Sequence, residues 1–163
     1  MLSYRHGFHA GNHADVLKHI ALVALLRILA RKDKPLLVVD THAGAGMYSL
    51  EQGFAVRNAE FRGGIGALWE RSDLPESVTD YLDQVRAVNP DGVLRQYPGS
   101  PRIALGVLRP QDRMRLFELH STEGAILARQ FAQESRRVTV TVGDGFAGLK
   151  AVRVHRQAHR TTG

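Results

Sequence analysis

Acidic side chains and glycines follow three apolar runs of the sequence, at the points where each run ends. The residues at these points are Asp40 followed by Gly44 and Gly46, then Glu118, and finally Asp144 followed by Gly145. A carboxylate placed there can accept hydrogen bonds from ribose hydroxyls or from an adenine amino group, and a glycine turn lets the backbone approach a ligand closely. Three such turns in succession predict a site for a nucleoside-type cofactor.

The glycine spacing also indicates which class of cofactor is disfavoured. A dinucleotide fingerprint has the form Gly-x-Gly-x-x-Gly, and this sequence has Ser49 where the third glycine belongs. The spacing therefore disfavours a nicotinamide-dependent oxidoreductase. Taken alone, the pair Gly44 and Gly46 fits equally well a strand-to-helix turn that needs glycine and binds nothing.

The elements that must position these residues form an α/β pattern. Strands are predicted at residues 36–40, 113–119 and 137–142, as a parallel sheet, with helices at 13–32, 102–108, 123–134 and from 146 onward. Because the first run is continuously apolar, we expect residues 36–40 to be buried on both faces. The second half of the first helix is apolar nearly all round, so we expect it to pack against the sheet.

Local signals mark where helices begin. Asn12 is predicted to cap the first helix, and Ser100 is predicted to cap the helix that follows Pro101. Residues 50–96 contain no clear strand, and their pattern predicts a helical insert with helices at about 65–70 and 76–85.

Composition describes a basic globular chain. The 163 residues carry a net charge of +6, of which residues 151–163 supply +3, and contain no cysteine. This charge favours a polyanionic partner such as nucleic acid. The longest apolar run, residues 20–26, is far shorter than the roughly 20 residues of a membrane span, so we expect no membrane association. The lack of cysteine excludes a disulfide framework and fits our expectation of a cytoplasmic protein.

Residues 1–13 are rich in histidine and glycine and are predicted to form an extended tail. His9, His13 and His19 raise the question of a metal site, but the glycines at 7 and 11 argue against the helix that would align them. We therefore expect no metal, and a tail whose aromatic and basic groups contact a base or a phosphate. A disordered terminus is the alternative.

Five stretches closely resemble one family, the ribosomal RNA large subunit methyltransferase J family of bacterial 23S rRNA adenine-N6 methyltransferases. They are residues 1–19, Asp40-Thr41-His42-Ala43-Gly44-Ala45-Gly46, Tyr97-Pro98-Gly99-Ser100-Pro101, Glu118-Leu119-His120 and Asp144-Gly145-Phe146. The likeness covers roughly residues 1–150, and residues 151–163 form a basic tail outside it.

The resemblance implies a Rossmann-like class I methyltransferase fold, here its N-terminal part, with the helical insert. It implies S-adenosyl-L-methionine as cofactor, 23S ribosomal RNA as partner, and a monomer. The implied cofactor-binding residues are His19, His42, Ser100, Glu118, Asp144 and Gly145. The residues implied to engage the RNA are Tyr4, His6 and Lys18.

One family motif has no counterpart in this sequence. Enzymes of this class hold the target amine with an Asp-Pro-Pro-Tyr sequence, and no Pro-Pro occurs anywhere in this chain. We therefore expect a truncated or frame-disrupted member that lacks the catalytic motif, leaves one edge of strand 36–40 unpaired, and is marginally stable. A non-catalytic RNA-binding fragment is the alternative function.

Overall fold

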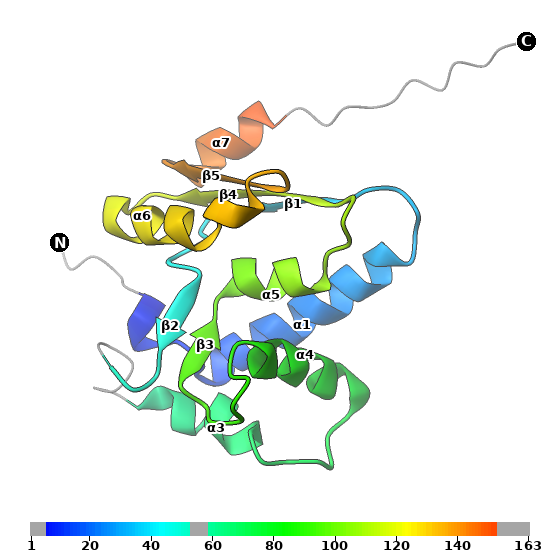
Figure 1. Cartoon of the computed structure of the whole chain (residues 1–163), viewed down its shortest axis with the longest axis vertical. Coiled ribbons are helices and arrows are strands. Elements are labelled where there is room, and N and C mark those ends of the chain that lie inside the picture. Colours follow the sequence, from blue (N-terminus) through cyan, green and yellow to red (C-terminus); the bar gives the residue numbers. More distant parts are fainter. Residues whose placement is uncertain (1–5, 53–58, 153–163) are drawn as a thin grey trace, which may run out of the picture.

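The computed structural model of the chain describes residues 6–52 and 59–152 (Figure 1). In chain order the elements are η1 (His6–Phe8), α1 (His13–Ala30), β1 (Leu37–Asp40), β2 (Met47–Ser49), η2 (Glu60–Arg62), α3 (Ile65–Leu68), α4 (Glu76–Ala87), β3 (Gln96–Pro98), α5 (Ser100–Val107), β4 (Arg113–Glu118), α6 (Ser121–Gln130), η3 (Ala132–Glu134), β5 (Val138–Val142) and α7 (Gly145–Ala151). None of the described helices is long and apolar enough to cross a membrane.

The predicted parallel sheet is confirmed. Its strand order is β1-β4-β5, with Asp40 beside Leu116 and Glu118 beside Val142, so the carboxyl ends of the three strands share one edge. Figure 1 shows α7 on one face of this sheet and α5 and α6 on the other. The apolar cluster beneath the second face includes Leu116 of β4 and Leu127 of α6.

The expectation that β1 is buried on both faces is wrong. Leu37 is 42% exposed and the rest of β1 is only half-buried. Among the described strands, β1 pairs with β4 alone, so it stands at the edge of the sheet. An apolar run predicts burial only where other elements cover both faces of the strand, and an edge strand has fewer such neighbours. The unpaired edge itself agrees with what the sequence led us to expect.

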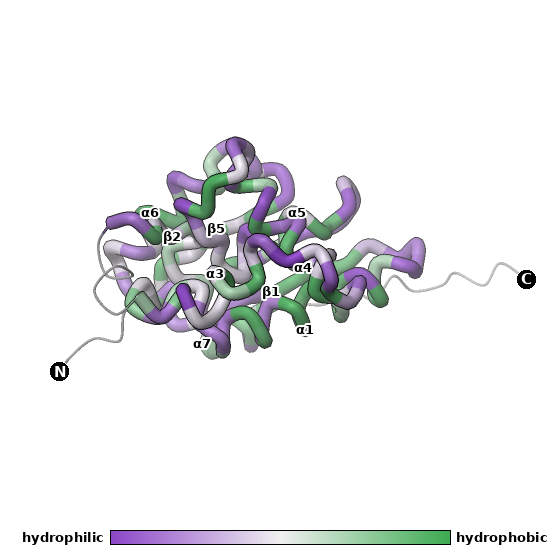
Figure 2. Tube along the Cα trace, turned by 90° about the horizontal axis from the view of Figure 1, so that it is seen from below, coloured by the Kyte–Doolittle hydropathy of each residue, from purple (hydrophilic) through white to green (hydrophobic). Residues whose placement is uncertain are grey.

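Helix α1 begins as predicted but packs elsewhere. The side chain of Asn12 accepts a hydrogen bond from the backbone N–H of Asp15 at 3.0 Å, which confirms the cap. The helix packs mainly on α4 and α5, so our expectation that its second half packs on the sheet holds only in part: Leu26 of that half joins the apolar cluster of the sheet. Leu25 and Ile28 remain more than half exposed, and Figure 2 shows hydrophobic residues along α1.

Residues 6–12 do not form the predicted extended tail. They make one 3-10 turn and then dock on the helical insert, where Ile65 N–H donates to the carbonyl of Gly11 at 2.9 Å. The approach is so close that a Cβ on Gly64 would lie 2.1 Å from that carbonyl oxygen. The side chain of His9 also forms a hydrogen bond with Glu60 of the insert, with Nδ1 and Oε2 2.9 Å apart.

The two helices predicted within residues 50–96 are present as α3 and α4, but the strands on either side of them were not predicted. Strands β2 and β3 form a short antiparallel ribbon that brackets the insert, with Tyr48 opposite Tyr97. Three-residue strands leave too little alternation to be read from sequence. A second apolar cluster, which contains Tyr81, Tyr97 and Ile65, joins this ribbon to the insert and to α1.

Helix α5 begins two residues earlier than the predicted 102–108, and its cap lies one residue earlier. Gly99 is its N-cap and Ser100 is its first residue, so the prediction that Ser100 caps the helix is wrong. The Ser100 hydroxyl turns instead toward the end of β1, as described below.

Candidate functional site

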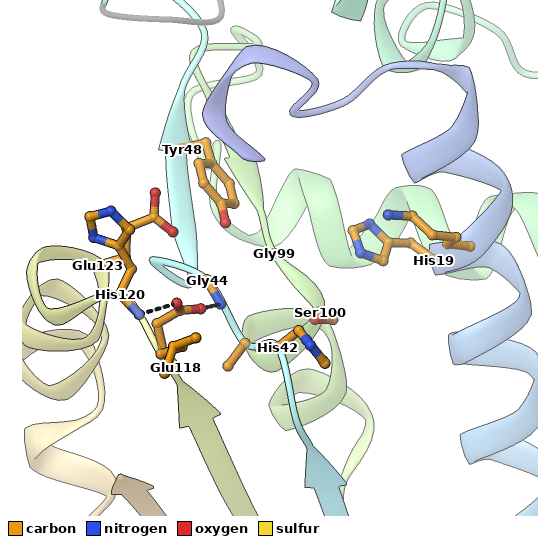
Figure 3. A pocket seen from close by; sticks show the side chains of 12 residues that line it. His19, His42, Gly44, Tyr48, Gly99, Ser100, Glu118, His120 and Glu123 are labelled. Carbon is orange, nitrogen blue, oxygen red and sulfur yellow. Dashed lines mark hydrogen bonds between the residues drawn. The ribbon is translucent and has the colours of Figure 1, made fainter. Parts of the chain in front are cut away.

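A cavity of about 560 Å³ opens at the carboxyl ends of β1 and β4 (Figure 3). Its walls come from the turn after β1, the start of α5, the loop from β4 into α6, and the first turns of α1. The lining residues are Lys18, His19, His42, Ala43, Gly44, Tyr48, Gly99, Ser100, Glu118, Leu119, His120 and Glu123. The volume lies within the range of small-molecule sites, roughly 300–1,000 Å³.

Glu118 ties two walls of the cavity together. Its Oε2 accepts a hydrogen bond from the backbone N–H of Gly44 at 2.8 Å, and its Oε1 accepts one from the backbone N–H of His120 at 2.7 Å (Figure 3). Each carboxylate oxygen has two lone pairs, so both oxygens can accept a further hydrogen bond from a ligand. The side chain is therefore both fixed in orientation and able to receive two hydroxyl groups.

The turn after β1 is shaped by glycine and by an aspartate. Gly44 has φ +63°, a left-handed conformation that glycine adopts without penalty. Asp40 accepts hydrogen bonds from Ser100 Oγ at 2.6 Å and from the backbone N–H of His42 at 3.0 Å. These contacts place His42 and Ser100 on the same side of the cavity (Figure 3).

Tyr48 was missed by the sequence reasoning. Its hydroxyl oxygen accepts a hydrogen bond from the backbone N–H of Ala45 at 3.3 Å, and burial raises the pKa of Tyr48. A Cβ on Gly44 would lie 2.3 Å from the same oxygen, so the turn and the tyrosine fit only because residue 44 is glycine. No sequence signal marks Tyr48, because it reaches the cavity through the unpredicted ribbon.

The start of α6 contributes two more residues that the sequence did not single out as ligands. His120 and Glu123 line the cavity beside Glu118. In the described part of the chain, Nδ1 of His120 is buried without a hydrogen-bond partner. A buried nitrogen of this kind is uncommon in folded proteins, and a ligand can pair with it as donor or as acceptor, according to the tautomer of the ring.

Helix α1 presents Lys18 and His19 to the cavity. His19 is 4% exposed, and its Nδ1 lies 2.8 Å from the hydroxyl of Tyr97. Lys18 is mostly exposed, and its Nζ pairs with Oδ1 of the buried Asp15 at 2.7 Å. The helix thus holds a buried imidazole and a more exposed cation at one wall.

Asp144 and Gly145 lie after β5, at the same edge of the sheet, but do not line this cavity. Asp144 caps α7 by accepting a hydrogen bond from the backbone N–H of Phe146 at 2.8 Å. A Cβ on Gly145 would lie 2.2 Å from the carbonyl oxygen of Thr41, so glycine lets α7 start directly against the turn after β1. Their role with a cofactor stays a prediction.

The structure therefore brings together His19, His42, Ser100, Glu118 and Lys18 of the predicted residues. Tyr4 lies outside the described residues, and of His6 only the backbone, at the start of η1, is described. Across residues 6–52 and 59–152, no three His, Asp or Glu side chains gather in a way that could hold a metal ion.

Comparison with known proteins identifies a family that the sequence matches. Residues 33–161 match a family model described as "Ribosomal RNA large subunit methyltransferase D, RlmJ". Two curated proteins named "Ribosomal RNA large subunit methyltransferase J" are 49% identical over 151 residues (Escherichia coli) and 46% identical over 152 residues (Haemophilus influenzae). Each alignment covers 93% of this chain and 54% of the relative, so the chain spans about half the length of the curated relatives it matches.

A solved structure resembles the fold over most of the described chain. A crystal structure of a protein from Legionella pneumophila superposes with a TM-score of 0.80 at 41% sequence identity. The superposition covers 88% of this chain and 52% of the Legionella protein. The mixed α/β arrangement with a parallel sheet is thus consistent with a methyltransferase-like fold.

Proposed function

The chain belongs to the family of ribosomal RNA large subunit methyltransferase D, RlmJ, and we propose that its cavity binds S-adenosyl-L-methionine for N6-methylation of an adenine in 23S ribosomal RNA. The single observation that carries the proposal is the position of Glu118. Its carboxylate is fixed by the backbone N–H groups of Gly44 and His120 at the carboxyl end of a parallel strand, where such sheets bind nucleosides.

The cavity fits a nucleoside-type methyl donor in three respects. The tight turn at Gly44 leaves backbone at the wall, where only glycine avoids a clash with Tyr48. The oxygens of Glu118 can accept from ribose hydroxyls, and the buried Nδ1 of His120 can pair with a polar group of the ligand. The volume, about 560 Å³, also suits a ligand of this class.

In the proposed complex, S-adenosyl-L-methionine supplies an electrophilic methyl group on sulfur. Glu118 binds and orients the ribose, while His42, Ser100 and His19 line the remaining wall. Asp144 is proposed to meet the adenine amino group from the next strand end. We further propose a Rossmann-like class I fold for the family domain, in which this chain provides the donor half of the site, and a monomer in the cytoplasm.

The acceptor side of the reaction requires groups that this sequence does not contain. No Asp-Pro-Pro-Tyr motif is present to accept hydrogen bonds from the target amine or to stack on a flipped base. Tyr4, His6 and Lys18 are proposed to engage the RNA near the donor. We therefore expect this chain to bind the donor weakly, and to transfer methyl groups very slowly or not at all.

The test measures donor binding and methyl transfer on the same sample. Calorimetry with S-adenosyl-L-methionine is expected to show binding, and transfer of labelled methyl to protein-free 23S rRNA, followed by digestion to nucleosides, is expected to show little or no N6-methyladenosine. No donor binding by folded protein overturns the donor site. Abundant N6-methyladenosine shows that an acceptor site exists within these residues.

A second candidate, a non-catalytic RNA-binding protein, is favoured by the net charge of +6. It predicts retained RNA binding that weakens steeply with salt, together with no measurable donor binding. The same calorimetry therefore separates the two functions.

A further inference from the structure

Three buried aromatic side chains run from the helical insert to the wall of the cavity. The hydroxyl of Tyr81 on α4 lies 3.0 Å from the hydroxyl of Tyr97 on β3, and the latter lies 2.8 Å from Nδ1 of His19 on α1. Both tyrosines are 0% exposed, and the rings of His19 and Tyr97 stack with centroids 5.7 Å apart. Bulk water therefore does not reach the two hydroxyl groups.

The protons of these three hydrogen-bonded side chains can be counted. Each tyrosine hydroxyl carries one proton to donate and can also accept, whereas a neutral imidazole has one donor and one acceptor nitrogen. Burial raises the pKa of both Tyr81 and Tyr97, so both hydroxyls keep their protons. Within the described residues, Tyr81 Oη has no hydrogen-bond partner other than Tyr97.

Only one arrangement gives both hydroxyl protons an acceptor. Tyr81 donates to Tyr97, Tyr97 donates to Nδ1 of His19, and the imidazole carries its proton on Nε2. If His19 donated from Nδ1 instead, the hydroxyl proton of either Tyr97 or Tyr81 would be left buried with no acceptor among the described residues. An unpaired buried donor is costly, so the first arrangement is strongly preferred.

We propose that Tyr97 is a positioning residue, which holds His19 at the cavity wall as the neutral tautomer that is protonated on Nε2. This inference rests on the proposed function, because it concerns how the donor site is built. The imidazole then carries an N–H, and not a lone pair, at Nε2. Tyr81 occupies the acceptor side of Tyr97 and so leaves the Tyr97 proton for His19.

The chain provides a matched pair of variants. Y97F and Y81F each remove one buried hydroxyl of the same cluster and keep the ring. Y81F still leaves Nδ1 of His19 as the single acceptor for the Tyr97 proton, so the tautomer is retained. Y97F removes the partner of Nδ1 altogether. A role in packing alone predicts that the two variants behave alike.

The experiment reads the imidazole nitrogens directly. Long-range ¹H–¹⁵N spectra of the ¹⁵N-histidine-labelled protein, at a pH well above 7, report which nitrogen of His19 carries the proton, with the signals assigned by H19Q. We expect an unprotonated, hydrogen-bonded Nδ1 in the unmodified protein and in Y81F, and a changed Nδ1 signal in Y97F. Thermal unfolding establishes that each variant is folded.

Titration with S-adenosyl-L-methionine gives the second readout. Loss of one orienting hydrogen bond predicts a Kd for Y97F that is roughly 2- to 10-fold higher, with Y81F within about twofold of the unmodified protein. A proton on Nδ1 in the unmodified protein overturns the proposal, as do equal affinity losses in the two variants. If no protein binds the donor, the proposed function fails, and the nitrogen signals alone then support or overturn the tautomer.

Discussion

Glu118 and Gly44 are joined by a hydrogen bond of 2.8 Å between a carboxylate oxygen and a backbone N–H. This contact links the end of β4 to the turn after β1, two segments 74 residues apart in the sequence. It makes the second acidic residue of the pattern part of the first glycine turn, so the two sequence features form one site.

Replacing Glu118 with glutamine tests that site. An amide can accept a hydrogen bond from only one of the two backbone N–H groups that the carboxylate now satisfies, at Gly44 and His120. Hydrogen bonds to charged groups contribute about 1.5–3 kcal/mol, so E118Q is expected to weaken S-adenosyl-L-methionine binding about tenfold or more. Calorimetry measures the change.

The matched control is E70Q, at an exposed carboxylate of the helical insert. It is expected to leave donor affinity unchanged. Equal affinities for E118Q and E70Q would contradict the assignment of Glu118 to the donor site.

Gly44 is expected to tolerate no side chain. Alanine there must adopt φ +63° and places a Cβ 2.3 Å from the hydroxyl of Tyr48. The left-handed conformation alone costs about 1–3 kcal/mol, and the clash adds to it. Urea denaturation of G44A should therefore show a clearly lower free energy of unfolding.

Two other glycines separate conformation from contact. Gly92 has φ +77° with nothing near its Cβ position, so G92A measures conformational strain alone. Gly143 has neither a positive φ nor a close neighbour, so G143A should be nearly neutral. If G44A costs no more than G92A, the packing of Tyr48 against the turn is looser than described.

Asp112 is expected to make stability depend on acid. It is fully buried, and burial alone raises its pKa. Hydrogen bonds from Arg109 and from the backbone N–H of Leu36 outweigh burial and lower the pKa to about 2. Because the folded pKa lies below the unfolded value of 3.8, this stabilisation is present above pH 4 and is lost as the pH falls through about 2.

The corresponding variant is D112N, which should lower the free energy of unfolding at pH 7 by about 1–2 kcal/mol and flatten the fall in stability below pH 4. Urea denaturation at pH 7 and pH 3 measures both effects. D73N, at an exposed aspartate paired with Arg71, is the control and should change little. If the free energy of unfolding of D112N falls below pH 4 as steeply as that of the unmodified protein, Asp112 is not the cause of the acid dependence.

The open edge of β1 is expected to limit the stability and solubility of the isolated chain. Leu37 is 42% exposed on a strand that, among the described elements, has a neighbour on one side only. L37K places a charge on that edge and should reduce concentration-dependent association, measured by light scattering. L149K, at an exposed leucine of α7, should not reduce it to the same degree.

Thermal unfolding gives a second check on the same feature. We expect a transition at or below the usual range of about 45–65 °C for mesophilic domains. A cooperative transition well above that range contradicts marginal stability.

The sequence determined the three strands of the parallel sheet, the helices beside them, and the acidic residues at the strand ends. Alternation at residues 138–142, the N-cap at Asn12 and the acids after each strand depend on local chemistry, so they could be predicted without tertiary contacts. Parallel strands bring their carboxyl ends to one edge, so Glu118 could be placed beside the Gly44 turn from topology alone.

The tertiary structure decided which side chains meet. Tyr48 reaches the cavity, and Tyr97 reaches His19 behind the cavity wall, through a ribbon of three-residue strands that carries no readable period. Asp144 caps α7 and does not line the cavity. Residues 6–12 dock on the insert, and β1 is exposed at an edge. Such outcomes depend on what packs against a segment, and a residue's own neighbours in the chain do not contain that information.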